Sequence, residues 1–196
     1  MLDGVGDDFR PSRDLAEWAL ACFVEPASAI ANPDHAHLEH ASLGFLWTNV
    51  ANARAGRRIV GQCELGEPAG MTGRWAKARA RAQIAAWFGD VPDFIVTIDA
   101  AAAVEMTDAE FCALIEHELY HAGQERDPFG APKFRQTGAP AFAIRGHDVE
   151  EFVGVVRRYG AGAAGVAALV EAARMPPQIA STSIAGICGT CHARAA

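Results

Sequence analysis

The chain has 196 residues, of which 51% are hydrophobic and 21% charged, and its formal net charge is −7. This size and composition are typical of one globular domain with a sizeable core, and they leave no room for a second domain of similar size. The acidic balance argues against a nucleic-acid surface, because phosphate binding depends on clustered Lys and Arg. No window holds the ~18 consecutive apolar residues that a membrane-crossing helix needs.

Three features of the sequence bear on the cellular compartment and on possible partners, namely the N-terminus, the cysteines and the basic residues. The first residues carry an acid before any apolar stretch, so the basic and apolar regions of a secretory signal are missing and we expect a cytoplasmic protein. Five cysteines form an odd and scattered set, which is not typical of a disulfide framework. The one local basic cluster, residues 74–81, is expected to form a solvated helix face.

Regular elements can be predicted along the first half of the chain. Apolar residues at helical spacing follow the potential cap Ser12 and predict a helix that ends near Pro26. Three further segments have strand composition and one has the pattern of an amphipathic helix; in chain order they are the strands 43–49 and 58–65, the helix 75–88 and the strand 92–99. The first two strands, separated by a polar loop with a glycine, are predicted to be antiparallel neighbours.

The second half begins with the pattern of a capped helix. Thr107 is followed by Glu110 at capping-box spacing, and the helix is expected to continue to about Glu125. Residues 127–146 contain several prolines and glycines and are predicted to form a long irregular connection. Two more helices are expected downstream, at 152–159 after another cap-like opening and at 163–174.

The predicted helix contains the sequence His117-Glu118-Leu119-Tyr120-His121, an HExxH motif. Positions i and i+4 of a helix share a face, so His117 and His121 can bind one ion. Zinc accepts neutral imidazole nitrogens, and a catalytic zinc site uses three protein ligands plus a water. Glu118 follows the first histidine directly and is the natural general base for that water. The alternative is that both histidines are partly exposed polar residues of an amphipathic helix.

A third ligand is expected after the irregular connection, where His147, Asp148, Glu150 and Glu151 lie. Asp148 and Glu151 have spacing suited to capping the next helix, which explains them without a metal. His147 is therefore the first choice for the third ligand, and Glu150 is the alternative. With such a ligand the motif indicates metal-assisted hydrolysis of a peptide bond.

Two segments carry a family resemblance. The sequence from His117 to Ala122, followed by Gly146 to Phe152, resembles the putative phage metallopeptidases, a prophage-borne group with a HELxHA site and a following HDxEEF segment. It is also similar, less closely, to the SprT/Spartan-like zincins. The resemblance covers roughly residues 43–159.

The resemblance implies a ligand set when it is carried over position by position. It places zinc on His117, His121 and His147, with Glu118 as the base. Where SprT-like proteins have Gly-Pro after the third histidine, this chain has Asp148 and Val149. The DNA–protein crosslink protease activity of Spartan is therefore not carried over.

Other side chains suit supporting roles in such a site. A donor to the developing oxyanion is wanted, and Tyr159 is the candidate, with Arg157 and Arg158 beside it, although each of these side chains also fits a surface or packing role. Three histidines cluster at His35, His37 and His40. A second metal site is conceivable there, but solvated or hydrogen-bonded histidines are the simpler interpretation.

The C-terminal segment Cys188-Gly189-Thr190-Cys191-His192 matches the CxxCH pattern of c-type haem attachment. Haem attachment takes place outside the cytoplasm, where we do not expect this chain. The two thiolates, with His192, also resemble part of a zinc ribbon such as SprT-like proteins carry. Cys188 and Cys191 therefore stay candidates for a second metal site or a redox pair.

These patterns together predict an α+β, zincin-like fold with a small, mainly antiparallel sheet packed on an HExxH helix and a C-terminal helical region. One domain is expected over residues 1–176, followed by a tail over 177–196. The expected function is that of a zinc-dependent metallopeptidase, encoded by a phage or prophage, which acts on a protein or peptide in the host cytoplasm. The alternative is a zinc-binding protein without turnover that serves as a regulatory or interaction module in phage–host conflict.

Overall fold

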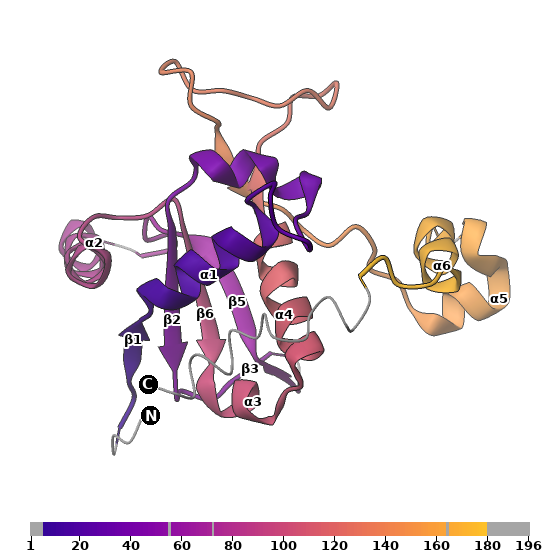
Figure 1. Cartoon of the computed structure of the whole chain (residues 1–196), viewed down its shortest axis with the longest axis horizontal. Coiled ribbons are helices and arrows are strands. Elements are labelled where there is room, and N and C mark those ends of the chain that lie inside the picture. Colours follow the sequence, from indigo (N-terminus) through magenta and orange to yellow (C-terminus); the bar gives the residue numbers. More distant parts are fainter. Residues whose placement is uncertain (1–5, 55, 72, 164, 180–196) are drawn as a thin grey trace. The chain divides into compact units, whose positions relative to one another are not determined.

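The structure, a computed structural model, describes residues 6–54, 56–71, 73–163 and 165–179. Two compact units divide after Arg145. The first combines a four-stranded sheet with several helices, and the second, from Gly146 onward, holds two short helices (Figure 1). The chain is therefore a mixed α and β protein with small sheets, as the sequence predicts.

The first unit begins with a short strand and a capped helix. The side chain of Ser12 accepts a hydrogen bond from the Leu15 N–H and so satisfies a free donor at the start of α1, as predicted. The elements of this unit are, in chain order, β1 (Phe9–Pro11), α1 (Arg13–Phe23), the 3-10 helix η1 (Pro33–His40), β2 (Leu43–Thr48), β3 (Asn52–Arg54), β4 (Arg57–Ile59), β5 (Gly61–Leu65), α2 (Arg74–Phe88), β6 (Phe94–Asp99), α3 (Ala100–Glu105), α4 (Asp108–His121), β7 (Ala122–Gln124) and β8 (Phe142–Ile144).

The central sheet has the order β1-β2-β6-β5 and is mixed. β6 pairs in parallel with β2 and antiparallel with β5, while β1 pairs antiparallel with β2. β6 is buried along almost its whole length, as expected of an apolar strand that is covered on both faces. β5 forms one edge of this sheet, and this edge lies beside α4.

The predicted pairing of the two strands at 43–49 and 58–65 is wrong. β6 lies between β2 and β5, and the short hairpin in that region is formed by β3 and β4 instead. Strand composition indicates that a segment is extended, but it does not identify the partner strand. β6, which is buried along almost its whole length, takes an interior position between β2 and β5.

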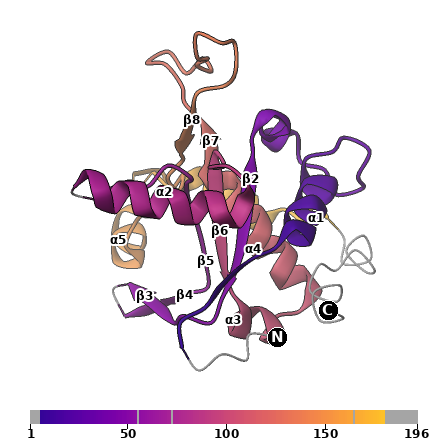
Figure 2. The ribbon, with the colours of Figure 1, turned by 90° about the vertical axis from the view of Figure 1, so that its left-hand side faces the viewer.

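Helices cover both faces of the sheet. On one face, Phe111 of α4 stacks on Trp47 of β2 and lies against Trp18 of α1, with ring centroids 6.0 and 5.8 Å apart. On the other face, α2 crosses the strands (Figure 2), and its Phe88 packs so closely over Gly44 that a Cβ there would lie 2.7 Å from the ring. One face of the sheet therefore packs against α4, and the opposite face packs against α2.

The helix that carries the HExxH motif begins as predicted and ends earlier. Thr107 and Glu110 form a capping box, in which each side chain accepts from the backbone N–H of the other residue. The helix ends at His121 rather than near residue 125, because Ala122 leaves the helical conformation and starts β7. The motif therefore occupies the C-terminal end of α4 instead of its middle.

The segment at 127–146 is not the irregular connection that its prolines and glycines suggest. Its base is the antiparallel pair β7–β8, and further out two isolated bridges, Arg126↔Pro132 and Phe134↔Pro140, each close a smaller hairpin. Gly130 and Gly138 lie at turns with φ of 85° and 83°, which a residue with a Cβ rarely adopts. The two glycines thus mark the turns of a double hairpin, and Pro132 and Pro140 lie at its bridges.

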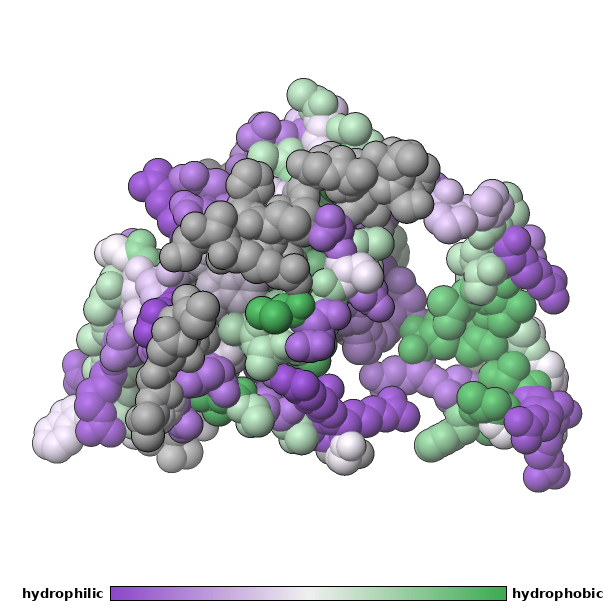
Figure 3. All heavy atoms as spheres, turned by 60° about the horizontal axis from the view of Figure 1, so that its bottom comes forward, coloured by the Kyte–Doolittle hydropathy of each residue, from purple (hydrophilic) through white to green (hydrophobic). Residues whose placement is uncertain are grey.

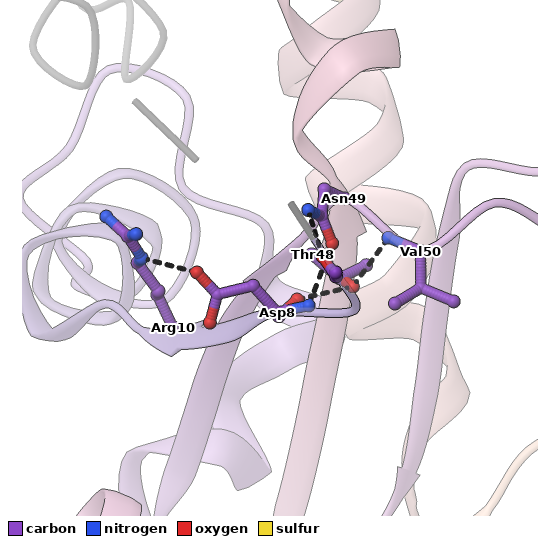
Figure 4. Close-up of polar contacts among 6 residues, drawn as sticks. Asp8, Arg10, Thr48, Asn49 and Val50 are labelled. Carbon is purple, nitrogen blue, oxygen red and sulfur yellow. Dashed lines mark hydrogen bonds and ion pairs between the residues drawn. The ribbon is translucent and has the colours of Figure 1, made fainter. Parts of the chain in front are cut away.

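The edge strand β1 is held by polar contacts around the end of β2 (Figure 4). The Asp8 N–H donates to Asn49 Oδ1 at 2.9 Å, and Thr48 Oγ1 donates to the Asp8 carbonyl at 2.9 Å. Arg10 Nε pairs with the Asp8 carboxylate at 2.8 Å. Such contacts fix the register of a strand that is only three residues long.

The second unit contains α5 (Val153–Ala163) and α6 (Ala167–Arg174), so the last helix begins later than the predicted residue 163. Large apolar side chains are exposed on this unit (Figure 3), among them Phe152, Val153, Leu169 and Met175. Within the described residues no single helix is long and apolar enough to cross a membrane, although the bent pair α5 and α6 passes that test when taken together. The predicted boundary at residue 176 stays a prediction.

Candidate metal centre

His117 and His121 converge at the exposed end of α4. Their Nε2 atoms are 3.2 Å apart and their rings meet edge to face, with centroids 4.9 Å apart. Two imidazole nitrogens bound to one tetrahedral zinc ion lie about 3.3 Å apart, given Zn–N bonds of about 2.0–2.1 Å. The two side chains are therefore oriented as a chelating pair without rearrangement.

The backbone after β8 sets the orientation of His121. Its Nδ1 lies 2.7 Å from the carbonyl oxygen of Arg145, and the Arg145 N–H donates to the His121 carbonyl at 2.9 Å. Because a carbonyl oxygen only accepts, Nδ1 carries the proton and Nε2 keeps its lone pair. This is the arrangement by which metal-binding histidines are commonly fixed in one tautomer.

Glu118 lies between α4 and the edge strand β5. Its side chain is buried, with 3% exposed, and the backbone N–H of Cys63 donates to its carboxylate. Burial raises the pKa of Glu118, against the opposing effects of the His121 charge and the Cys63 hydrogen bond. The buried Glu118 carboxylate beside the histidine pair is therefore suited to accept and release a proton.

His147 follows Arg145 by two residues, so the chain itself keeps it within about 7 Å of that residue. One nitrogen from each of His117, His121 and His147 lies within 4.8 Å of the others, and no other group of three potential ligands in the described part of the chain meets this condition. Glu150, the alternative ligand, lies 3.7 Å from His147 Nδ1 through its Oε1. These residues could hold a metal ion.

Two contributors to this site were missed because they act through backbone atoms. The Arg145 carbonyl and the Cys63 N–H carry no signal in the sequence, since any residue type supplies them. Their roles depend on β8 and β5 lying beside α4. Only a prediction of that packing would have found them.

The other predicted histidine cluster does not form a metal site among the described residues. His35 is fully buried, and neither of its ring nitrogens has a hydrogen-bond partner. His37 Nε2 donates to the Ala122 carbonyl at 2.7 Å, and His40 is exposed. The simpler interpretation, a hydrogen-bonded or solvated histidine, thus holds for His37 and His40.

The remaining candidates are Tyr159 and the pair Cys188 and Cys191. Tyr159 is 64% exposed on α5, where the Arg158 guanidinium lies 5.5 Å over its ring, and its role as an oxyanion donor stays a prediction. Cys188 and Cys191 lie outside the described residues. A cavity of about 960 Å³ opens beside the end of α4, with Tyr120 and Arg145 in its wall.

Comparison with known families decides the identity of the chain. A family model described as "Putative phage metallopeptidase" matches residues 16–174. The chain belongs to this family. The matched span includes the α4 histidines, Glu118 and His147, and the family name implies a metal ion and a polypeptide substrate. No curated protein and no solved structure matches the chain, and the resemblance to SprT/Spartan-like zincins stays a prediction.

Proposed function

We propose that this chain is a zinc-dependent peptidase of the HExxH type with a zincin-like arrangement. His117, His121 and His147 would hold the metal, and Glu118 would be the general base. The observation that carries the proposal is the 3.2 Å approach of two imidazole Nε2 atoms next to a buried carboxylate. We place its activity in the cytoplasm of the host cell.

The donor set favours zinc over the harder cations. Three imidazole nitrogens suit Zn²⁺, whereas Mg²⁺ and Ca²⁺ prefer oxygen ligands. When bound, zinc acts as a Lewis acid that acidifies water and polarises the peptide carbonyl. Three ligands leave one position for that chemistry, which distinguishes a catalytic from a structural zinc site.

Glu118 would move the proton during hydrolysis. Its carboxylate accepts a proton from the attacking water, the oxygen adds to the peptide carbonyl carbon, and the same proton passes to the leaving amine as the C–N bond breaks. The Cys63 N–H holds one side of the carboxylate, and burial keeps bulk water away from it. The raised pKa makes the protonated form of Glu118 easier to reach.

His147 and Glu150 would divide the roles that the sequence left open. With Glu150 Oε1 3.7 Å from His147 Nδ1, the carboxylate can orient the imidazole and leave Nε2 for the metal. We therefore propose His147 as the third ligand and Glu150 as its positioning residue. The alternative function, a zinc-binding protein without turnover, uses the same ligands and differs only in what Glu118 does.

The substitution Glu118→Gln tests the catalytic half of the proposal. It removes the proton acceptor while it keeps the size of the side chain, so peptide hydrolysis should fall by at least about 100-fold. Zinc content should stay at the wild-type level, because Glu118 is not a ligand. Hydrolysis of unstructured polypeptides and zinc content would be measured on the same preparations.

The matched control is Glu105→Gln, which makes the same change at an exposed carboxylate at the end of α3. Its activity should stay far above that of Glu118→Gln. If the wild-type protein binds zinc and Glu118→Gln retains the full biological activity of wild type, the alternative function, a zinc-binding protein without turnover, is correct instead.

A further inference from the structure

One asparagine ties η1 to the motif-bearing end of α4. Asn32 Nδ2 donates to Glu116 Oε1 at 2.7 Å and to the Tyr120 hydroxyl at 2.8 Å. Its Oδ1 accepts from the Asp34 N–H at 3.0 Å, and its backbone N–H donates to the Phe23 carbonyl at 2.9 Å. Asn32 thus joins the end of α1, the start of η1 and two successive turns of α4.

The two α4 partners of Asn32 stand directly before the two histidines of the motif. Glu116 and Tyr120 are four residues apart and share one helix face, as do His117 and His121 on the adjacent face. Holding both partners fixes the rotation of this part of α4 about its axis. A functional site tolerates deviations of only roughly 10–20° or 0.5 Å. Rotation of α4 would therefore displace both imidazoles together.

The contacts around Asn32 extend this tie to the end of the helix. The Tyr120 hydroxyl donates to Asp34 Oδ2 at 3.1 Å, and the His35 ring packs edge to face on Tyr120 with centroids 4.6 Å apart. His37 Nε2 donates to the carbonyl of Ala122, the residue after His121. The histidine-bearing η1 therefore holds the last turn of α4 at more than one point.

We propose that Asn32 is a positioning residue of the metal site, which sets the rotation of the last α4 turn and hence the approach of His117 and His121 Nε2. This inference rests on the proposed zinc site. It assigns η1 a function in metal affinity, in place of the second metal site that its histidines suggest. Removing the Asn32 donor should lower zinc affinity by more than a general loss of folding stability would explain.

Reversing the donor and the acceptor gives a sharp test. In Asn32→Asp a carboxylate faces the Glu116 carboxylate and no donor remains between them, so zinc affinity should fall by about 10- to 100-fold, the usual effect of losing a residue that orients metal ligands. When Asn32→Asp is combined with Glu116→Gln, the new amide at position 116 would donate to the new carboxylate at position 32, and zinc affinity should return to within about threefold of wild type. Chelator competition would measure the affinities, and thermal unfolding of the metal-free proteins would measure stability.

Thr107→Ala is the control for general weakening of α4. It removes the N-terminal cap of the same helix and should lower the melting temperature without changing zinc affinity. The proposal is overturned if Asn32→Asp binds zinc as wild type does, or if Thr107→Ala loses as much affinity at equal loss of stability. It is also overturned if the double substitution does not recover affinity. A wild-type protein that binds no zinc at this site overturns the proposed function together with this inference.

Discussion

Glu118 owes its position to a residue without a side chain. A Cβ on Gly61 of β5 would lie 2.7 Å from Glu118 Oε1 and 2.9 Å from Leu114 Cδ1. Both contacts are with the far ends of flexible side chains, which can move aside. The fold can therefore accept an alanine at position 61, but the carboxylate cannot keep its place.

Gly61→Ala should consequently reduce activity much more than stability. A displacement of about 1 Å at a catalytic group can cost up to about 100-fold in rate, so we expect a loss of this order in kcat/KM. Gly154→Ala, where an added Cβ has no neighbour within 4 Å, is the matched control and should be as active as wild type. Equal activity of Gly61→Ala and Gly154→Ala would contradict the assigned position of Glu118.

At the scale of single residues, the sequence predicts which side chains form the site but not the residues that position them. The HExxH spacing alone predicts the proposed ligands His117 and His121 and the proposed base Glu118, because helical periodicity places them together. Gly61 and Asn32 could not be predicted, because their contacts with α4 arise from segments more than 50 residues away. Neither residue type has a pattern that signals such a contact.

Among the elements, η1 is unusual because it buries a histidine against α4. Burial lowers the pKa of His35 to about 4, with a further effect of the His37 charge and a smaller one of Arg145, while Asp34 opposes them. Glu116 Oε1 also faces His35 Nε2 at 3.8 Å. The folded protein thus keeps His35 neutral at a pH where the unfolded chain protonates it.

The fold should lose stability as the pH falls from about 6.5 toward 4, since the unfolded state then binds a proton that the folded state does not. Between pH 7 and 4.5, His35 should account for roughly 2 kcal/mol of this loss. His35→Leu removes the titrating group and should be less sensitive to acid by that amount. Urea unfolding of both metal-free proteins at the two pH values is the measurement; parallel losses would show that His35 does not carry the effect.

The elements themselves show where local sequence signals are sufficient. The caps and apolar periodicity of α1 and α4 predict their starts correctly, because capping involves only neighbouring residues. The order of β2, β6 and β5 could not be predicted, because these strands pair with segments that are distant in the sequence. The end of α4 at His121 was also missed, since β7 begins there only by pairing with the distant β8.

For the whole molecule, the proposed ligands come from a preformed helix end and from the segment that follows β8. The helix supplies His117 and His121. Arg145, whose carbonyl oxygen is hydrogen-bonded to His121, precedes His147 by two residues. Such a design couples metal binding to the local order of the 145–147 segment. The tail thiols Cys188 and Cys191 are a separate potential metal site, so any test must exclude them.

The central claim is tested most directly by the zinc content of purified protein in a background in which Cys188 and Cys191 are both replaced by serine. About one zinc ion per chain is expected in this background. His117→Ala, His121→Ala and His147→Ala should each lose most of it, while Glu150→Gln should retain it. Equal zinc content in all of these variants would contradict the account.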